Sequence, residues 1–238
     1  MISSDRRTLD DAVCYHSRIA VDFNDSYKRE ANRRERLRVW RGYLDRYLDG
    51  ATLAYDMGCG SGILAADIAA RGISTIAIDG SARMLELARR TARERGCIAN
   101  IEFRQHGLPI SAIAGFQRAD AIISSSVVEY LDSVRNTLVS FRGLLRPRGI
   151  VIFSMPNGDS FKRKVVRLGY RLSGRPRYLR FVKHFATVAT LKQDVAAAGL
   201  TYLDHMYLEG SGPLDGVIRR FTNERRSTNM IIMAARRD

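Results

Sequence analysis

The spacing of hydrophobic positions changes several times along the chain, beginning with a helical period near the N-terminus. In residues 29–48 the apolar side chains recur every three or four positions, at Leu37, Trp40, Leu44 and Leu48. This spacing is typical of one face of a helix, and most of the other positions are charged. The stretch therefore predicts an amphipathic helix that ends near Gly50, and with the residues before it an N-terminal helical cap over residues 1–50.

From residue 51 onward, short apolar runs alternate with helical patterns. Strands are predicted at 52–57, 74–79, 100–105, 119–126, 149–155, 201–209 and 229–237. Helices are predicted at 62–72, 81–96, 134–145 and 187–200. Strands that alternate with helices of this length predict parallel βαβ units, so residues 51–238 form one α/β domain. A chain of 238 residues is long enough for one such domain with a core.

One segment, residues 156–186, interrupts this alternation after the fifth predicted strand. It carries Lys or Arg at positions 162, 163, 164, 167, 171, 175, 177, 180 and 183, and no acid lies between Asp159 and Asp194. Apolar and aromatic residues are interleaved with the basic ones. Three interpretations stay open: a solvated lid, a lid that touches an anionic membrane, and a clamp for a carboxylate- or phosphate-bearing substrate. Interleaved aromatic and basic residues also suit RNA.

The junction between the first predicted strand and the next helix is rich in glycine. It reads "DMGCGSG", in which Asp56 precedes Gly58, Gly60 and Gly62. Glycine lets a backbone approach a ligand closely, and a helix N-terminus presents free N–H groups. A tight turn without a ligand is the alternative. Asp79 ends the second predicted strand, where an acid can accept the hydroxyls of a ribose. Together these features predict a nucleoside-containing ligand.

The spacing of the glycines narrows the choice of nucleoside. It is GxGxG and not GxGxxG, and the chain has no GxxxxGK[ST], so dinucleotide and nucleoside triphosphate loops fit poorly. The stretches "YDMGCGSG", "IAIDGSARMLELAR", "ADAIISSSVVEYLDS" and "LLRPRGIVIFSMPN" resemble successive motifs of the class I S-adenosylmethionine-dependent methyltransferases of small molecules. The resemblance implies a Rossmann-like, mostly parallel seven-stranded sheet of order 3-2-1-4-5-7-6 with helices on both faces. It also implies S-adenosyl-L-methionine as cofactor and S-adenosyl-L-homocysteine as product.

The same resemblance implies a set of cofactor-binding residues. Asp56 would orient the loop and the cofactor's amino group, Asp79 would hold the ribose, and residues 80–84 would border the adenine. The full set is Asp56, Gly58, Cys59, Gly60, Gly62, Asp79, Gly80, Ser81, Met84, His106, Ser124 and Ser125. Many family members carry an acid after the third strand, whereas this chain has "QHGLP" there. Recognition of the adenine at that point would fall to the backbone or to His106.

Candidates for a catalytic base follow from the chemistry of methyl transfer. Transfer from a sulfonium is a direct displacement, so alignment of the reactants matters most. A hydroxyl acceptor also needs a base. His184 ends the basic insert, His106 follows the third predicted strand, and Glu129 and Tyr130 lie just past the fourth. Each has an alternative as a structural or surface residue.

Composition adds information about partners and location. Lys and Arg number 39 against 25 Asp and Glu, a net charge of +14 that favours an anionic partner or reflects a solvated surface. The fourth-strand motif lacks (D/N)PP(Y/F) and a Pro-Cys pair, which argues against methylation of nucleic acids at adenine N6 and cytosine C5 but leaves other RNA methylation open. The three cysteines form no CxxC pair, so neither a disulfide framework nor a metal site is expected. No apolar run reaches the ~20 residues of a membrane span. A cytoplasmic protein, with peripheral contact to the membrane's inner face through residues 156–186 as an option, is expected.

The sequence thus predicts an enzyme that methylates a small-molecule or lipid-linked acceptor, with oxygen preferred as the acceptor atom. The alternatives are N-methylation of a small metabolite, RNA methylation, and a methyltransferase-fold protein that binds cofactor without catalysis. An intact glycine loop together with Asp79 favours the enzyme. The identity of the acceptor and the oligomeric state stay open.

Overall fold

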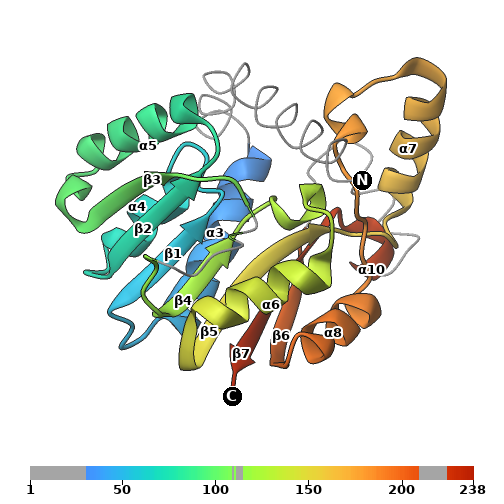
Figure 1. Cartoon of the computed structure of the whole chain (residues 1–238). Coiled ribbons are helices and arrows are strands. Elements are labelled where there is room, and N and C mark those ends of the chain that lie inside the picture. Colours follow the sequence, from blue (N-terminus) through green and yellow to red (C-terminus); the bar gives the residue numbers. More distant parts are fainter. Residues whose placement is uncertain (1–30, 109, 111–114, 209–223) are drawn as a thin grey trace.

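A single seven-stranded sheet organises the computed structural model, which describes residues 31–108, 110, 115–208 and 224–238. The strands are ordered β3-β2-β1-β4-β5-β7-β6 across the sheet (Figure 1). They are β1 (Leu53–Met57), β2 (Ser74–Asp79), β3 (Ile101–Gln105), β4 (Ala119–Ser124), β5 (Leu145–Pro156), β6 (Leu200–Leu208) and β7 (Met230–Arg237). All neighbouring pairs are parallel except those of β7, which runs antiparallel to β5 and β6. The predicted order is confirmed.

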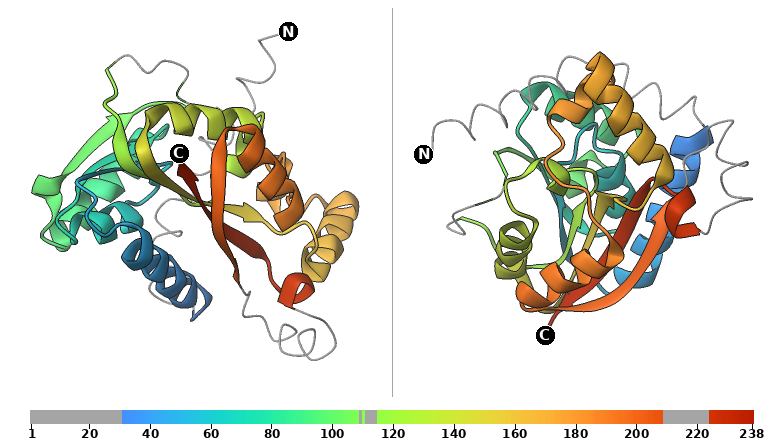
Figure 2. Two further views of the ribbon diagram at one scale, coloured as in Figure 1. Left: turned by 90° about the horizontal axis from the view of Figure 1, so that it is seen from below. Right: turned by 90° about the vertical axis from the view of Figure 1, so that its right-hand side faces the viewer.

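Helices cover both faces of the sheet, as predicted (Figure 2). They are α3 (Ala31–Tyr47), α4 (Ile63–Ala69), α5 (Ala82–Glu94), α6 (Val134–Leu144), α7 (Phe161–Ser173), α8 (Val188–Ala197) and the short α10 (Glu224–Ser227). Side chains of α6 and α8 pack on one face, and those of α3, α4 and α5 pack on the other. Successive strand residues point to opposite faces, so Tyr55 faces α6 and α8 while Ala54 faces α3 and α4.

The predicted N-terminal amphipathic helix is present as α3. Trp40, Tyr43, Leu44 and Leu48 are buried in the layer that α3 shares with α4 and the sheet. The apolar stripe read from the sequence is therefore the packing face of this helix. Residues 1–30 of the predicted cap lie outside the described residues.

The basic insert rises from the carboxyl end of β5 and contains α7 and the 3-10 helix η3 (Arg177–Arg180) (Figure 1). The Ser160 hydroxyl caps α7 by accepting the Arg163 N–H, and Gly174 ends it with a φ of 65°. The insert leaves and returns at one point. Gly158 N–H donates to the Ala186 carbonyl at 2.8 Å, and Ala186 N–H donates to Pro156 at 3.0 Å.

Two further 3-10 helices flank the ends of strands. These are η1 (Ile98–Asn100) before β3 and η2 (Val128–Tyr130) after β4. Among the residues that the structure describes, no helix is both long and apolar enough to cross a membrane.

Candidate functional site

The three glycines between β1 and α4 have different neighbours. All three have positive φ, which disfavours a side chain there. A Cβ on Gly58 would lie 2.3 Å from Val127 Cγ2, and one on Gly62 would lie 2.7 Å from Ala88 Cβ. A Cβ on Gly60 would meet no atom of the described residues within 4 Å. Gly58 and Gly62 therefore allow close packing, whereas Gly60 borders space that the described residues leave open, where a ligand can approach the backbone.

Asp79, at the end of β2, holds this loop in place. Its Oδ2 accepts the Gly60 N–H and its Oδ1 accepts the Ser81 N–H, each at 2.9 Å. Each carboxylate oxygen can accept a second hydrogen bond, and the side chain is partly exposed. Burial raises the pKa of Asp79. The Ser81 hydroxyl accepts the Met84 N–H at 3.2 Å and so caps α5. Asp79 can therefore still receive hydroxyl groups, while the Ser81 hydroxyl serves its helix.

Asp56 is buried at the other end of the loop, with an exposed fraction of 1%. Burial raises its pKa to about 7, although the N–H of Ala65 near the start of α4 favours the charged form. Among the residues that the structure describes, its Oδ2 has no hydrogen-bond partner. A buried acceptor left unpaired costs about 1–3 kcal/mol. A cationic donor beside Asp56 would remove that cost, so this side chain fits a ligand with an ammonium group.

The serines that end β4 divide between internal and exposed positions. Ser124 is buried, and its hydroxyl donates to the Met57 carbonyl at 3.1 Å. Ser125 and Ser126 accept hydrogen bonds from the guanidinium of Arg36 on α3, at 2.7 Å and 2.9 Å. Ser124 thus joins β4 to β1, and Ser125 lies partly exposed at the carboxyl edge of the sheet.

Glu129 on η2 is a second buried acid at this edge of the sheet. Its exposed fraction is 3%, and its Oε2 has no hydrogen-bond partner in the described part of the chain. Burial raises the pKa of Glu129 to about 7, against the opposing charges of Arg36 and Arg163. Its main-chain carbonyl accepts the N–H groups of Lys183 and His184, at 2.8 Å and 3.2 Å. The end of the basic insert is thus fastened directly to η2.

The other candidate bases occupy two separate places. The Nε2 of His184 lies 2.9 Å from the Leu131 carbonyl oxygen and 3.1 Å from that of Asp132. A ring nitrogen that faces two carbonyls carries its proton, so this atom donates and cannot accept. The main-chain N–H of His106 donates to the Asp79 carbonyl at 3.1 Å. His184 therefore lies with Glu129, whereas His106 lies beside the end of β2.

Tyr130 follows Glu129, and burial together with the Glu129 charge raises the pKa of its hydroxyl. It therefore keeps its proton over the ordinary pH range.

Arg36, Arg163 and Tyr178 also influence the charges around Glu129 and Tyr130. Sequence reasoning did not single out these three residues. Each belongs to a charged helix or a basic run, and only the fold shows which members of the run turn inward.

Comparisons with known proteins agree with this architecture. A family model described as a methyltransferase domain matches residues 30–205. The chain belongs to this methyltransferase domain family. The ubiquinone biosynthesis O-methyltransferase of Methylocella silvestris is 32% identical over 165 residues, which cover 68% of this chain and 62% of that protein. The protein of the same name from Acinetobacter baylyi is 30% identical over 63% of each chain. The matched part of this chain therefore spans about three fifths of the length of these two curated relatives.

Solved methyltransferase structures share the fold. Magnesium protoporphyrin IX methyltransferase from Synechocystis PCC 6803, solved with S-adenosyl-L-homocysteine, has a TM-score of 0.63 and 17% identity. The match covers 87% of this chain and 84% of that one. N-methyltransferase NodS from Bradyrhizobium japonicum WM9, solved with the same molecule, has a TM-score of 0.58 and 17% identity, with 89% and 90% covered. At this identity the likeness concerns the fold alone.

Proposed function

We propose that this methyltransferase-family chain transfers a methyl group from S-adenosyl-L-methionine to an oxygen of a small or lipid-like acceptor in a biosynthetic pathway. The observation that carries the proposal is the buried, unpartnered Oδ2 of Asp56 beside a glycine loop that borders open space at Gly60. The names of the 30–32% identical relatives, O-methyltransferases of ubiquinone biosynthesis, support oxygen as the acceptor atom.

The residues of the loop fit this cofactor. Asp56 would pair with its ammonium group, which supplies the donor that Oδ2 lacks. Asp79 would accept the ribose hydroxyls with its remaining lone pairs. The backbone of Gly60 would border the cofactor, and the segment from Gly80 to the buried Met84 would border the adenine.

When bound, the cofactor supplies an activated methyl group on a sulfonium. The chain's own task is then to orient the acceptor and to take up its proton. Glu129 suits the second task because its pKa of about 7 is close to neutral pH and its Oε2 has no hydrogen-bond partner among the described residues. His184 would act as a positioning residue, since its Nε2 donates to the turn after η2. His106 lies on the Asp79 side of the site and would border the cofactor.

The proposal is tested with methyl-labelled S-adenosyl-L-methionine, purified protein and fractionated bacterial extract. Label in small metabolites or organic-soluble material, released by cleavage of an ether rather than an amine, is the expected result. Label on nitrogen or in RNA would replace the proposed acceptor. Cofactor binding without transfer to any fraction would favour a non-catalytic cofactor-binding protein. Asp56→Asn is the matched negative control for cofactor-dependent transfer, since it keeps the size of the side chain and removes the charge that would pair with the cofactor.

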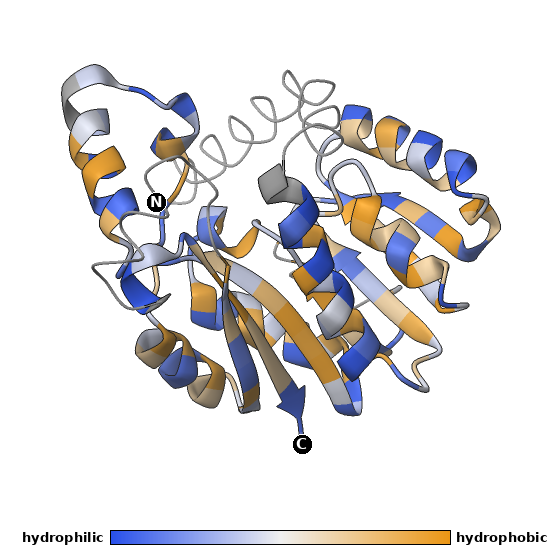
Figure 3. Cartoon of the chain, turned by 180° about the vertical axis from the view of Figure 1, so that it is seen from behind, coloured by the Kyte–Doolittle hydropathy of each residue, from blue (hydrophilic) through white to orange (hydrophobic). Residues whose placement is uncertain are grey.

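We also propose that the basic insert, residues 156–186, contacts the anionic inner face of a membrane. Phe161, Val165 and Leu168 lie at helical spacing on α7 and are 55%, 54% and 61% exposed. Apolar residues alternate with hydrophilic ones along α7 in Figure 3. Apolar side chains surrounded by basic ones are typical of helices that lie at a membrane interface.

Co-sedimentation with phosphatidylglycerol vesicles tests this contact. Binding is expected to fall when Phe161, Val165 and Leu168 are all changed to Ser, and to weaken as salt is raised. Val139→Ser is the control, because Val139 is 49% exposed on α6, away from the insert. Equal binding by the triple variant and the wild type would exclude α7 as the contact.

A further inference from the structure

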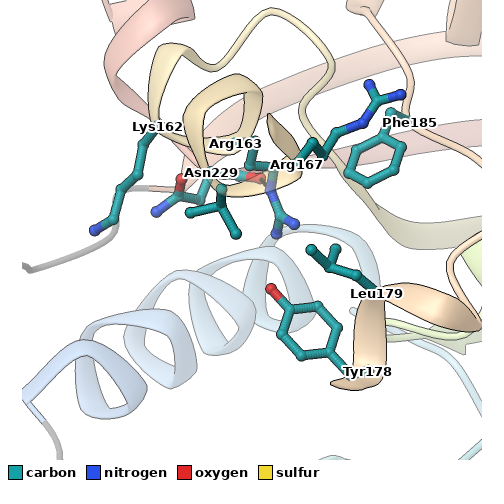
Figure 4. Close-up of a pocket in the computed structure, with 8 residues that line it drawn as sticks. Lys162, Arg163, Arg167, Tyr178, Leu179, Phe185 and Asn229 are labelled. Atoms are coloured by element: carbon teal, nitrogen blue, oxygen red, sulfur yellow. Dashed lines mark hydrogen bonds between the residues drawn. The ribbon is translucent and has the colours of Figure 1, made fainter. Parts of the chain in front are cut away.

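A cavity of about 140 Å³ lies between α7, η3 and the residue before β7. Figure 4 shows the side chains that line it. The lining residues include Lys162, Arg163, Arg167, Tyr178, Leu179 and Phe185. Three of them are cations and none is an acid. The cavity therefore has a strongly positive wall and an apolar, aromatic remainder.

The guanidinium of Arg163 is largely enclosed by the protein. It donates to the Asn229 carbonyl and to the Met230 Sδ, and neither partner carries a charge. In the part of the chain that the structure describes, Arg163 forms no ion pair with a carboxylate. Burial lowers its pKa, and the Arg36 charge acts in the same direction. A buried cation without a matching anion is costly, so this position favours an anionic ligand.

The Glu129 carboxyl group, which acts on Arg163, does not balance this charge. Glu129 acts on Arg163 through space, but its own pKa of about 7 means that it carries only part of a negative charge near neutral pH. Arg36, which donates to Ser125 and Ser126, also acts on the charge of Glu129. Two guanidinium groups thus share one partly ionised carboxyl group.

The remaining walls suit a flat group. The Arg167 guanidinium lies over the Phe185 ring, 4.4 Å from its centroid. Figure 4 shows the Tyr178 hydroxyl pointing toward the Arg163 guanidinium, with Leu179 alongside. Guanidinium groups bind planar oxyanions through paired hydrogen bonds. The volume accommodates one anionic group on a small ring and not an entire extended acceptor.

We infer that this cavity is a subsite for an oxyanion, a carboxylate or a phosphate, that belongs to the methyl acceptor. The inference rests on the proposed function, and it places the anionic end of the acceptor against Arg163 and Arg167. The reacting hydroxyl would then reach Glu129, whose charge is felt by Arg163. Acceptors with a neutral group at this end would bind less tightly.

The test measures binding of simple probes by calorimetry, separately from methyl transfer. Benzoate and phenyl phosphate represent the two oxyanions, and benzamide is the neutral counterpart of benzoate. We expect at least one oxyanion to bind about tenfold or more tightly than benzamide, equivalent to about 1.4 kcal/mol. Arg163→Gln and Arg167→Gln should each remove this preference, with the affinity for S-adenosyl-L-methionine unchanged. Lys164→Gln is the matched control, because Lys164 is exposed on α7 and does not line the cavity.

The outcomes separate the subsite from the proposed function. Arginine-dependent binding of an oxyanion, found without methyl transfer to any acceptor, would support the subsite and count against the function. Equal affinities for benzoate, phenyl phosphate and benzamide would overturn the subsite. A second result would also overturn the subsite. In it, neither oxyanion binds, and Arg163→Gln and Arg167→Gln abolish binding to phosphatidylglycerol vesicles. The two cations would then bind a lipid headgroup. Arg167 is exposed, so Arg167→Gln keeps the test valid if Arg163→Gln does not fold.

Discussion

Single residues of the glycine loop differ in what they do, although the sequence presents them as equivalent. Gly62 lies against Ala88 of α5, and Gly58 lies against Val127 after β4. Gly60 alone of the three faces open space. The loop therefore combines two packing requirements with one ligand requirement, and substitution can separate them.

Gly60→Ala and Gly62→Ala are predicted to have different effects. Both place a side chain at positive φ, at a cost of about 1–2 kcal/mol. Gly62→Ala adds a clash with Ala88, so it should lower the free energy of unfolding further. Gly60→Ala should fold more stably than Gly62→Ala yet lose affinity for S-adenosyl-L-methionine. Urea unfolding and calorimetry give the two quantities. A Gly60→Ala protein with unchanged cofactor affinity would contradict the role of Gly60.

The Asp56 carboxyl group predicts a pH dependence for cofactor binding. Its pKa of about 7 means that it is mainly protonated at lower pH and must ionise to pair with an ammonium group. Affinity should therefore rise with pH up to about pH 7 and level off above it, with a slope near tenfold per unit well below the pKa. In Asp56→Asn the affinity should be about 10–100-fold lower at pH 8 and nearly independent of pH. Calorimetry across this range checks both statements.

At the level of secondary-structure elements, Asp67 joins three helices. It lies buried on α4, where Oδ2 accepts from Arg41 of α3 at 3.0 Å and Oδ1 accepts from Arg95, after α5, at 2.7 Å. These contacts link α3, α4 and α5, which pack on the same face of the sheet. The orientation of the loop's helix thus depends on a polar connection as well as on apolar packing.

Asp67→Asn is predicted to lower the free energy of unfolding by about 1–3 kcal/mol, since it removes the charge that both guanidinium groups share. The partial exposure of Arg41 and Arg95 keeps the loss from being larger. Glu35→Gln, which breaks the exposed pair with Arg38 on α3, is the control and should change stability by less than about 0.5 kcal/mol. Equal losses in the two variants would show that Asp67 has no special part in joining the helices.

Some elements could be predicted from the sequence and others could not. The strands and the helices between them followed from alternation, because their apolar residues face a core. The helix α7 was not predicted as a helix, because its apolar residues Phe161, Val165 and Leu168 point outward among cations. The strand β5 begins at Leu145 rather than at 149, and its pairing with β4 shifts register between Ala119 and Ala121. The local sequence "RPRG" looks like a turn, so it indicates neither the early start of β5 nor the register shift.

The candidate site shows the same division. Motifs located Asp56, Asp79 and the glycines, since loop chemistry is encoded locally. They could not show that the Ser124 hydroxyl bonds to β1, or that Nε2 of His184 is used by the main chain, because these partners are distant in the sequence. The roles assigned to these residues in binding and catalysis stay predictions.

For the whole molecule, the buried acid Glu129, which contacts the basic insert, predicts how the free energy of unfolding changes with pH. The pKa of Glu129 rises from the ordinary 4.5 to about 7, so between these values the unfolded chain ionises and the folded one does not. The free energy of unfolding therefore falls as pH rises through this window. Glu129→Gln removes the effect, so its stability relative to the wild type should increase from pH 4.5 to about 7, by on the order of 3 kcal/mol.

Urea titrations at several pH values measure this difference. Glu102→Gln is the control of opposite sign, because the hydrogen bond from Arg104 lowers the pKa of Glu102. Loss of the Glu102 charge should lower the free energy of unfolding slightly at neutral pH and should not change it at low pH. A Glu129→Gln curve parallel to that of the wild type would show that Glu129 ionises as an ordinary surface acid.

The way the insert is attached has a consequence for how such proteins diversify. Residues 158–185 leave and rejoin the sheet at a single bridge, between Asn157 and Ala186, so the path between them can change length without moving either end. A longer closed segment costs only slowly increasing entropy. The segment also contacts η2 through the Lys183 and His184 N–H groups. Grafting another relative's segment between Asn157 and Ala186, with this contact to η2 kept, offers a route to new acceptors while the cofactor-binding residues stay unchanged.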